Sequence, residues 1–283
     1  MAEYSRPEVL VDTSWLEERL GDKSIAIVEV DEDTSAYEKG HIPGAVSLNW
    51  DTELHDLPRR EFVSSEQLAD LLGRKGISSD QTIVLYGGNN NWFAAYAYWL
   101  FLYRGVAEDK LKLLNGGRKK WELESKPFTQ EQPSPAPARF EIGPERPDLR
   151  VFRDEVLQRG KSRSGGFVDV RSPEEFMGKV AAPPHLPQEQ AQVPGHIPGA
   201  SNIPWSKAVK DDGTFKPAEE LERLYADAGI TRDGDIITYC RIGERAAHSW
   251  FVLHELLGFE KVRNYDGSWT EYGSLVGAPV EKG

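Results

Sequence analysis

The hexapeptide GHIPGA stands at residues 40–45 and again at residues 195–200. Both copies are followed by a short stretch that ends in tryptophan, Trp50 in the first and Trp205 in the second. Matched segments recurring in one order indicate an internal duplication, in which one structural unit is encoded twice. We therefore expect two domains built on the same plan. The other similar pairs are IAIVEVDEDTSAY and GFVDVRSPEEF, TIVLYGGNNNWFAAYAYWLF and DIITYCRIGERAAHSWFVL, and LLNGGRKKW and VRNYDGSWTEY.

A proline-rich stretch separates the two copies. Proline favours an extended, semi-rigid chain, so this stretch is expected to be a linker. We place the first domain at residues 1–128, the linker at 129–147 and the second domain at 148–283. The second copy also carries a proline-rich insertion, residues 179–194, which we expect to form a surface loop.

Each half alternates short β-branched segments with segments of helical periodicity. Short apolar segments of this kind are typical of strands buried on both faces, and their alternation with helices indicates a parallel sheet. We predict an α/β fold of two tandem domains, each a mainly parallel sheet flanked by helices. The expected strands are 24–30, 81–87, 166–170 and 235–240, and the expected helices are 64–76, 217–229 and 244–258.

Composition excludes several classes of function. The formal net charge of −12 argues against a nucleic-acid partner and against an anionic membrane. The N-terminus lacks the pattern of a signal peptide, and no apolar segment is long enough to span a membrane. A single cysteine leaves no disulfide, no C-x-x-C pair and no cysteine-based zinc site, so we expect a cytoplasmic protein without a metal. No phosphate-binding glycine motif of correct form is present.

The single cysteine, Cys240, is expected at the end of a strand and just before a helix, where α/β sheets bind their ligands. Arg241 and Arg245 flank it, and Gly243 permits a tight turn that lets successive N–H groups converge on the sulfur. The positive end of the following helix acts in the same direction, and all three features favour the reactive thiolate. A lone cysteine is commonly a small buried apolar residue, but this combination of neighbours favours a nucleophile.

Cysteine-dependent phosphatases also place a thiolate and an arginine around one loop, with the spacing C-x5-R. Here the spacing from Cys240 to Arg245 is C-x4-R. The shorter loop is expected to crowd a tetrahedral phosphoryl group but to admit a single additional sulfur atom. A phosphatase is therefore the less favoured alternative.

These segments resemble those of the two-domain rhodaneses, the thiosulfate sulfurtransferases, over nearly the whole chain. YEKGHIPGAVSL, residues 37–48, resembles the N-terminal signature of the family, and VRNYDGSWTEY, residues 262–272, resembles the C-terminal one. CRIGER, residues 240–245, resembles the six-residue active loop that begins at the catalytic cysteine.

The resemblance implies a role for each matching position. Cys240 matches the residue that becomes a persulfide, Arg171 matches an arginine that faces the substrate anion, and Asp169 matches an aspartate that positions that arginine. Trp205 is a candidate for one wall of the pocket, with a plain core tryptophan as the alternative. The other expected site residues are Arg241 and Arg245, which bind substrate, and Ile242, Gly243 and Glu244, whose N–H groups hold the persulfide.

The first domain departs from the active pattern. Gly87 stands at the position of Cys240, and Asp31 stands at the position of Arg171. Neither the nucleophile nor a cationic surrounding remains, so we expect this domain to be catalytically inactive, as the resemblance also implies.

The expected function is transfer of the sulfane sulfur of thiosulfate to a thiophilic acceptor such as cyanide, with release of sulfite. The expected partners are thus a small anionic donor and a small acceptor, with no cofactor beyond the persulfide and a monomeric chain. A 3-mercaptopyruvate sulfurtransferase is the main alternative, although the two loop arginines favour the doubly charged thiosulfate. A non-catalytic binding module of the same fold is a further alternative.

Overall fold

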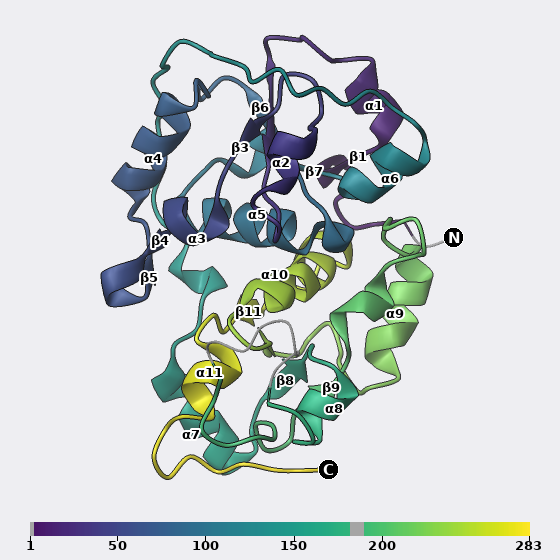
Figure 1. Ribbon diagram of the computed structural model, residues 1–283. Coiled ribbons are helices and arrows are strands. Elements are labelled where there is room, and N and C mark those ends of the chain that lie inside the picture. The colour runs from purple at the N-terminus through teal and green to yellow at the C-terminus, as the bar shows by residue number, and fades with distance from the viewer. Residues whose placement is uncertain (1–2, 182–189) are drawn as a thin grey trace. The chain divides into compact units, whose positions relative to one another are not determined.

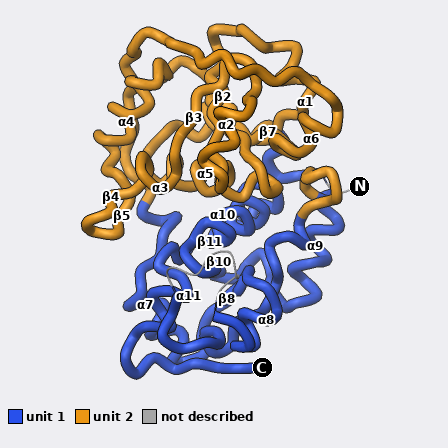
Figure 2. The backbone as a smooth tube through the Cα atoms, in the orientation of Figure 1, with its two compact units in different colours: residues 1–7, 147–208, 216–283 blue, residues 8–146, 209–215 orange. Residues whose placement is uncertain are grey.

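The computed structural model describes residues 3–181 and 190–283, so residues 182–189, half of the proline-rich insertion, lie outside the described residues. The chain forms two compact units, coloured separately in Figure 2. Unit 1 consists of Met1–Pro7, Pro147–Ala208 and Lys216–Gly283, and unit 2 consists of Glu8–Arg146 and Val209–Phe215. Each unit contains one copy of the sequence repeat.

Two short segments depart from the expected domain boundaries. Residues 1–7 belong to unit 1, where the Tyr4 hydroxyl donates a hydrogen bond to the carbonyl oxygen of Lys216 (2.8 Å). Residues 209–215 belong to unit 2, where the last N–H of the segment donates to Asn115 Oδ1 (3.0 Å). Each half of the sequence therefore supplies a few residues to the unit formed by the other half.

The expected linker, residues 129–147, is extended but is not a free tether. The N–H of Ala138 donates to the carbonyl oxygen of Gly73 (2.9 Å), and the N–H of Gly143 donates to that of Gly105 (2.8 Å). These bonds fasten most of the stretch to unit 2, which is why Glu8–Arg146 forms one compact body.

Unit 2 is built on a parallel sheet with the strand order β1-β7-β6-β2-β3. Figure 1 labels β1, β3, β6 and β7 of this sheet. A small antiparallel pair, β4 and β5, lies apart from it. The elements are β1 (Leu10–Val11), α1 (Thr13–Glu17), β2 (Ile25–Glu29), α2 (Ala36–Lys39), β3 (Val46–Ser47), α3 (Trp50–Glu53), β4 (His55–Asp56), β5 (Glu61–Phe62), α4 (Ser65–Arg74), β6 (Thr82–Tyr86), α5 (Trp92–Arg104), β7 (Leu111–Leu114) and α6 (Gly117–Leu123), with 3-10 turns at Pro7–Val9, Leu57–Arg59, Asn89–Asn91 and Glu108–Lys110.

Unit 1 repeats this plan with the parallel order β11-β10-β8-β9. Helix α10 packs on β10 and β11, the same arrangement that α5 has on β6 and β7 in unit 2. The elements are α7 (Arg153–Ser162), β8 (Gly166–Asp169), α8 (Pro173–Phe176), β9 (Ser201–Asn202), α9 (Ala218–Ala226), β10 (Ile236–Tyr239), α10 (Glu244–Phe251), β11 (Val262–Asn264) and α11 (Ser268–Tyr272), with 3-10 turns at Pro147–Leu149 and Trp205–Ala208 and a π-helical turn at Val252–Leu256.

The α/β class and the parallel sheets are as predicted, and each expected strand and helix is found within a few residues of its expected bounds. One helix differs in kind. The segment expected at 244–258 is α-helical only to Phe251 and continues as the π-helical turn.

The repeated hexapeptide makes the same contacts in both units. Its isoleucine N–H donates to a tyrosine hydroxyl on the central strand: Ile42 to Tyr86, and Ile197 to Tyr239, each at 3.1 Å. These tyrosines lie in the two apolar cores, so the motif joins its turn to the middle of the sheet. Sequence similarity between the halves thus reflects a shared packing requirement rather than a shared chemistry.

The histidine of the hexapeptide is a structural residue in both units. The His41 ring stacks on Tyr37 with centroids 3.7 Å apart, and the His196 ring stacks on Phe176 at 3.6 Å. The Nδ1 atom of each ring lies within hydrogen-bonding distance of the carbonyl oxygen of the same stacked residue. Both histidines therefore stabilise the local turn.

Candidate active site

Cys240 directly follows β10 and precedes α10, the position expected from the sequence. Its side chain is fully buried, with 0% exposure. The N–H of Gly243 points at the thiol, with 3.1 Å between this nitrogen and Sγ. Burial alone would fit a structural cysteine, but a backbone donor aimed at the sulfur indicates a site arranged for negative charge.

Three carbonyl oxygens of the loop accept hydrogen bonds from residues 264–270. Because these oxygens have partners, the orientation of their peptide planes is fixed. The bonds run from the Trp269 N–H to the Cys240 oxygen (3.0 Å), from the Thr270 N–H and Oγ1 to the Arg241 oxygen (3.0 and 2.8 Å), and from Asn264 Nδ2 to the Gly243 oxygen (3.1 Å).

Gly243 is required by this geometry. Its φ of +103° lies in the region that side chains disfavour, and a Cβ added there would lie 2.7 Å from the Cα of Asp266. The glycine therefore lets the chain turn closely against the 264–270 segment while its N–H faces Cys240.

Arg245, in the first turn of α10, forms a buried two-pronged ion pair with Glu175 of α8. Both N–O distances are 3.0 Å. Burial would by itself lower the pKa of Arg245, but the hydrogen bonds that it donates to Glu175 and its electrostatic interaction with Cys240 raise it overall. Burial would likewise raise the pKa of Glu175, yet Arg245 brings it below its ordinary value. Glu175 thus fixes a charged guanidinium close to the sulfur.

Glu175 has a second role at the start of α8. The Ser172 hydroxyl caps the helix by accepting from the Glu175 N–H (3.2 Å), and the Glu175 carboxylate accepts from the Ser172 N–H (3.0 Å). This reciprocal arrangement is a capping box, and it fixes the position of the carboxylate that pairs with Arg245. The pattern S-x-x-E at residues 172–175 is typical of such a cap, but the cap was not among our predictions; no sequence pattern indicates the ion pair.

Arg171 is bonded to groups of the protein itself, whereas the resemblance implied that it faces the substrate anion. Its side chain is only 1% exposed, its Nη2 donates to Asp169 Oδ2 (2.5 Å), and the same nitrogen donates to the carbonyl oxygen of Gly195 (2.7 Å). The guanidinium also lies over the ring of Trp269, 4.8 Å from its centroid. These partners are the protein's own groups, so we assign Arg171 to holding the GHIPGA turn rather than to substrate.

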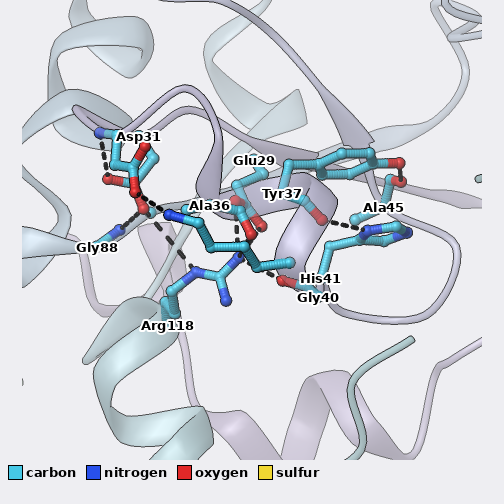
Figure 3. A network of polar contacts seen from close by, with 12 residues as sticks. Glu29, Asp31, Ala36, Tyr37, Gly40, His41, Ala45, Gly88 and Arg118 are labelled. Carbon is cyan, nitrogen blue, oxygen red and sulfur yellow. Dashed lines mark hydrogen bonds and ion pairs between the residues drawn. The ribbon is translucent and has the colours of Figure 1, made fainter. Parts of the chain in front are cut away.

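Unit 2 supports this reassignment, because an arginine makes the equivalent contacts there although the unit has no nucleophile. Figure 3 shows Arg118 between Glu29 and the carbonyl oxygen of Gly40. Glu29 is the counterpart of Asp169, and Gly40 is the counterpart of Gly195 in the other copy of the hexapeptide. The arginine comes from a different element in each unit, yet its two partners are equivalent, which is the signature of a structural role.

The remaining predicted site residues surround the loop to different degrees. Arg241 and Glu244 are buried, while Ile242 and Trp205 are half-buried. Trp205 packs edge-on against His248 of α10, with centroids 5.2 Å apart. The structure thus brings Cys240, Gly243 and Arg245 together, and places Trp205 against the helix that follows them.

The corresponding place in unit 2 has no room for a side chain at the position of Cys240. Gly87 stands where Cys240 stands, and a Cβ there would lie 2.2 Å from the carbonyl oxygen of Val30. Asp31 accepts from the N–H of Gly88 (2.6 Å), and burial raises its pKa despite that bond. Neither a thiol nor space for one is present at this position, and the catalytic inactivity of this half stays a prediction.

Across residues 3–181 and 190–283, no group of three or more histidine, cysteine, aspartate or glutamate side chains is placed to hold a metal ion. None of the helices in this part of the chain is both long and apolar enough to cross a membrane.

Comparison with known proteins identifies the family. The model of the rhodanese-like domain matches twice, at residues 12–124 and 153–275. This chain belongs to the rhodanese family. Its two matches coincide with the two copies of the sequence repeat, and the rhodanese loop that begins at Cys240 lies in the second.

Curated relatives extend over the full rhodanese chain. A protein of Mycobacterium bovis named "Putative thiosulfate sulfurtransferase 1" is 55% identical over 279 residues and covers 99% of each chain. The sulfur carrier protein TtuD of Thermus thermophilus is 53% identical over 283 residues, again covering 99% of each. The family and these relatives together support a sulfurtransferase.

Solved structures with the same fold are more distant in sequence. An anaerobic ergothioneine biosynthesis enzyme from Chlorobium limicola, solved with trimethyl histidine, has a TM-score of 0.84 at 24% identity and aligns with 100% of this chain and 72% of its own. YnjE has a TM-score of 0.81, also at 24% identity, with 100% and 70% covered. At this identity the likeness establishes the fold alone.

Proposed function

We propose that Cys240 takes the sulfane sulfur of thiosulfate as a persulfide and passes it to a thiophilic acceptor such as cyanide. The observation that carries the proposal is the Gly243 N–H aimed at Sγ from 3.1 Å, in a loop in which three carbonyl oxygens are held by residues 264–270. A donor so placed stabilises negative charge on the thiolate and on the outer sulfur of a persulfide.

The reaction has two half-reactions that meet at Cys240. In the first, the thiolate electron pair attacks the outer sulfur of thiosulfate, the S–S bond of the donor breaks, and its electron pair leaves on sulfite. In the second, the acceptor attacks the outer sulfur of the persulfide and the electron pair of that S–S bond returns to Cys240. With cyanide the product is thiocyanate, and no net proton is consumed. The sulfur is itself the group carried, so we propose a reaction without metal or organic cofactor.

The charges around the loop support thiosulfate over 3-mercaptopyruvate as donor. Arg245 stays charged beside the thiol because Glu175 fixes it, and the first turn of α10 adds its positive end. Arg241 follows the cysteine directly and is buried with it. These groups favour a doubly charged donor such as thiosulfate, whose two negative charges leave on sulfite while the thiolate charge moves to the outer sulfur of the persulfide.

Steady-state thiocyanate formation with each donor tests the proposal. We expect turnover with thiosulfate, lower kcat/KM with 3-mercaptopyruvate, and none with the Cys240→Ser variant. Equal or better use of 3-mercaptopyruvate would reverse the donor assignment. Turnover that survives in Cys240→Ser would remove the assigned nucleophile. Hydrolysis of an aryl phosphate would favour the phosphatase alternative.

The likeness to a protein named as a sulfur carrier supports a second proposal, that the acceptor in the cell is another protein. Persulfide formation would then be fast while turnover with cyanide is slow. Pre-steady-state measurement of sulfite release and thiocyanate formation separates the two: a slow second step favours a protein acceptor, and equal rates favour a small one.

A further inference from the structure

Ser268, the first residue of α11, joins two backbone groups next to the nucleophile. Its hydroxyl donates to the carbonyl oxygen of Tyr265 (2.6 Å) and accepts from the N–H of Cys240 (3.1 Å). The side chain is completely buried, and the residue has a φ of +51°, a conformation that costs free energy for any residue except glycine. A serine kept at such a position needs a reason beyond filling space.

Unit 2 makes the same connection with a different residue. Parallel pairing aligns Leu111 with Ile83 and Val262 with Ile236, so Gly117 is the counterpart of Ser268. There the Asn91 side chain accepts from the N–H of residue 87 (3.0 Å) and donates to the carbonyl oxygen of residue 114 (2.6 Å). Both units therefore bridge equivalent N–H and C=O groups.

The two bridges exclude one another. A Cβ on Gly117 would lie 2.1 Å from Asn91 Oδ1, so a serine there and the asparagine amide would occupy one space. Asn91 is the N-cap residue of α5, the place that Gly243 holds before α10, so it belongs to the loop itself. In the half without a nucleophile, the loop is thus closed from within. In unit 1 the bridge comes from outside the loop, from α11, and the loop interior remains for the sulfur.

We propose that Ser268 is a positioning residue for Cys240. Its hydroxyl holds the first peptide of the loop while the Trp269 and Thr270 N–H groups hold the next two carbonyl oxygens. Together these bonds set the peptide planes that turn the Gly243 N–H towards Sγ. The inference rests on the proposed role of Cys240 as the sulfur-accepting nucleophile, and it identifies a group that fixes the conformation of the loop.

The test compares Ser268→Gly with Ser268→Ala. Both remove the hydroxyl, but glycine relieves the positive φ whereas alanine keeps it, so alanine is expected to be the less stable variant. We expect both to lose sulfur transfer to a similar extent, about tenfold or more, since losing one buried hydrogen-bond partner changes rates on that order. The second-order rate of Cys240 alkylation by iodoacetamide should fall in parallel, with its pH midpoint displaced upward.

Ser65→Ala in unit 2 is the matched control, because Ser65 is also buried and donates to a backbone carbonyl, that of Arg104 (2.9 Å). It should lose stability without any change in Cys240 alkylation. The inference would be overturned if the alkylation rate of Cys240 in the two Ser268 variants fell only in proportion to their loss of stability. It would also be overturned if both variants were alkylated at the wild-type rate. If wild-type protein forms no persulfide while alkylation still depends on Ser268, the proposed function fails and the positioning role stands.

Discussion

Replacing Glu175 with glutamine should weaken the fold of unit 1 and at the same time make the thiol more reactive at low pH. Glu175 and Arg245 form two N–O contacts of 3.0 Å, and their side chains are 2% and 9% exposed. Breaking a buried pair by neutralising one partner costs about 3–5 kcal/mol, because the other charge stays buried without compensation. Glutamine keeps one acceptor oxygen, so we expect a loss of about 3 kcal/mol.

The effect on the thiol has the opposite sign. Arg245 interacts electrostatically with Cys240, and without Glu175 its positive charge is no longer balanced. An unbalanced positive charge favours a thiolate, so the pH midpoint of alkylation should move to lower pH. The stability difference between wild type and variant should itself shrink in acid. Because the pKa of Glu175 is lowered in the fold, its contribution is present above its ordinary value of 4.5 and is lost as the pH falls through the folded-state value.

Urea unfolding and iodoacetamide alkylation, each measured as a function of pH, provide the two readouts. Glu174→Gln is the matched control, since it removes the same charge from the same helix at an exposed position. It should change the free energy of unfolding by less than about 0.5 kcal/mol. The reasoning would be refuted if the Glu175 variant were as stable as the Glu174 variant, or if its alkylation midpoint moved to higher pH.

Three further changes give separate tests. Gly243→Ala places a Cβ 2.7 Å from the Asp266 backbone, so sulfur transfer should fall by at least about tenfold, and an unchanged kcat/KM would contradict the loop geometry. Gly87→Cys, made in a background without the native thiol, should destabilise unit 2 through its clash with the Val30 carbonyl and gain no sulfur by intact mass. Asp31→Asn should stabilise unit 2 at neutral pH, because burial raises the pKa of Asp31 and its ionised carboxylate therefore lowers the free energy of unfolding as the pH rises. That advantage should vanish in acid unfolding experiments.

Much of the fold could be predicted because it is encoded in local patterns. The repeated GHIPGA motif indicated two similar domains, β-branched segments marked the strands, and the lone cysteine fell at the end of one of them. The site was partly predictable for the same reason: the cysteine, Gly243 and Arg245 lie within six residues of one another.

What the sequence could not provide were partners distant along the chain. Arg245 is stabilised by a residue 70 positions away, and nothing in an arginine identifies its counter-ion. Arg171 was assigned to substrate because it matches an arginine of the family motif. Its contacts with Asp169 and Gly195 become visible only in the fold. Ser268 was missed because its importance emerges only from comparison with Asn91, whose side chain accepts a hydrogen bond from the equivalent N–H group in the other unit.

The most direct test of the central claim is the intact mass of the protein after treatment with thiosulfate and removal of excess donor. The account predicts one added sulfur atom on the wild type, its loss on addition of cyanide, and no addition to Cys240→Ser. A wild type that gains no sulfur, or a serine variant that gains it, would contradict the assignment of Cys240 as the sulfur-accepting nucleophile.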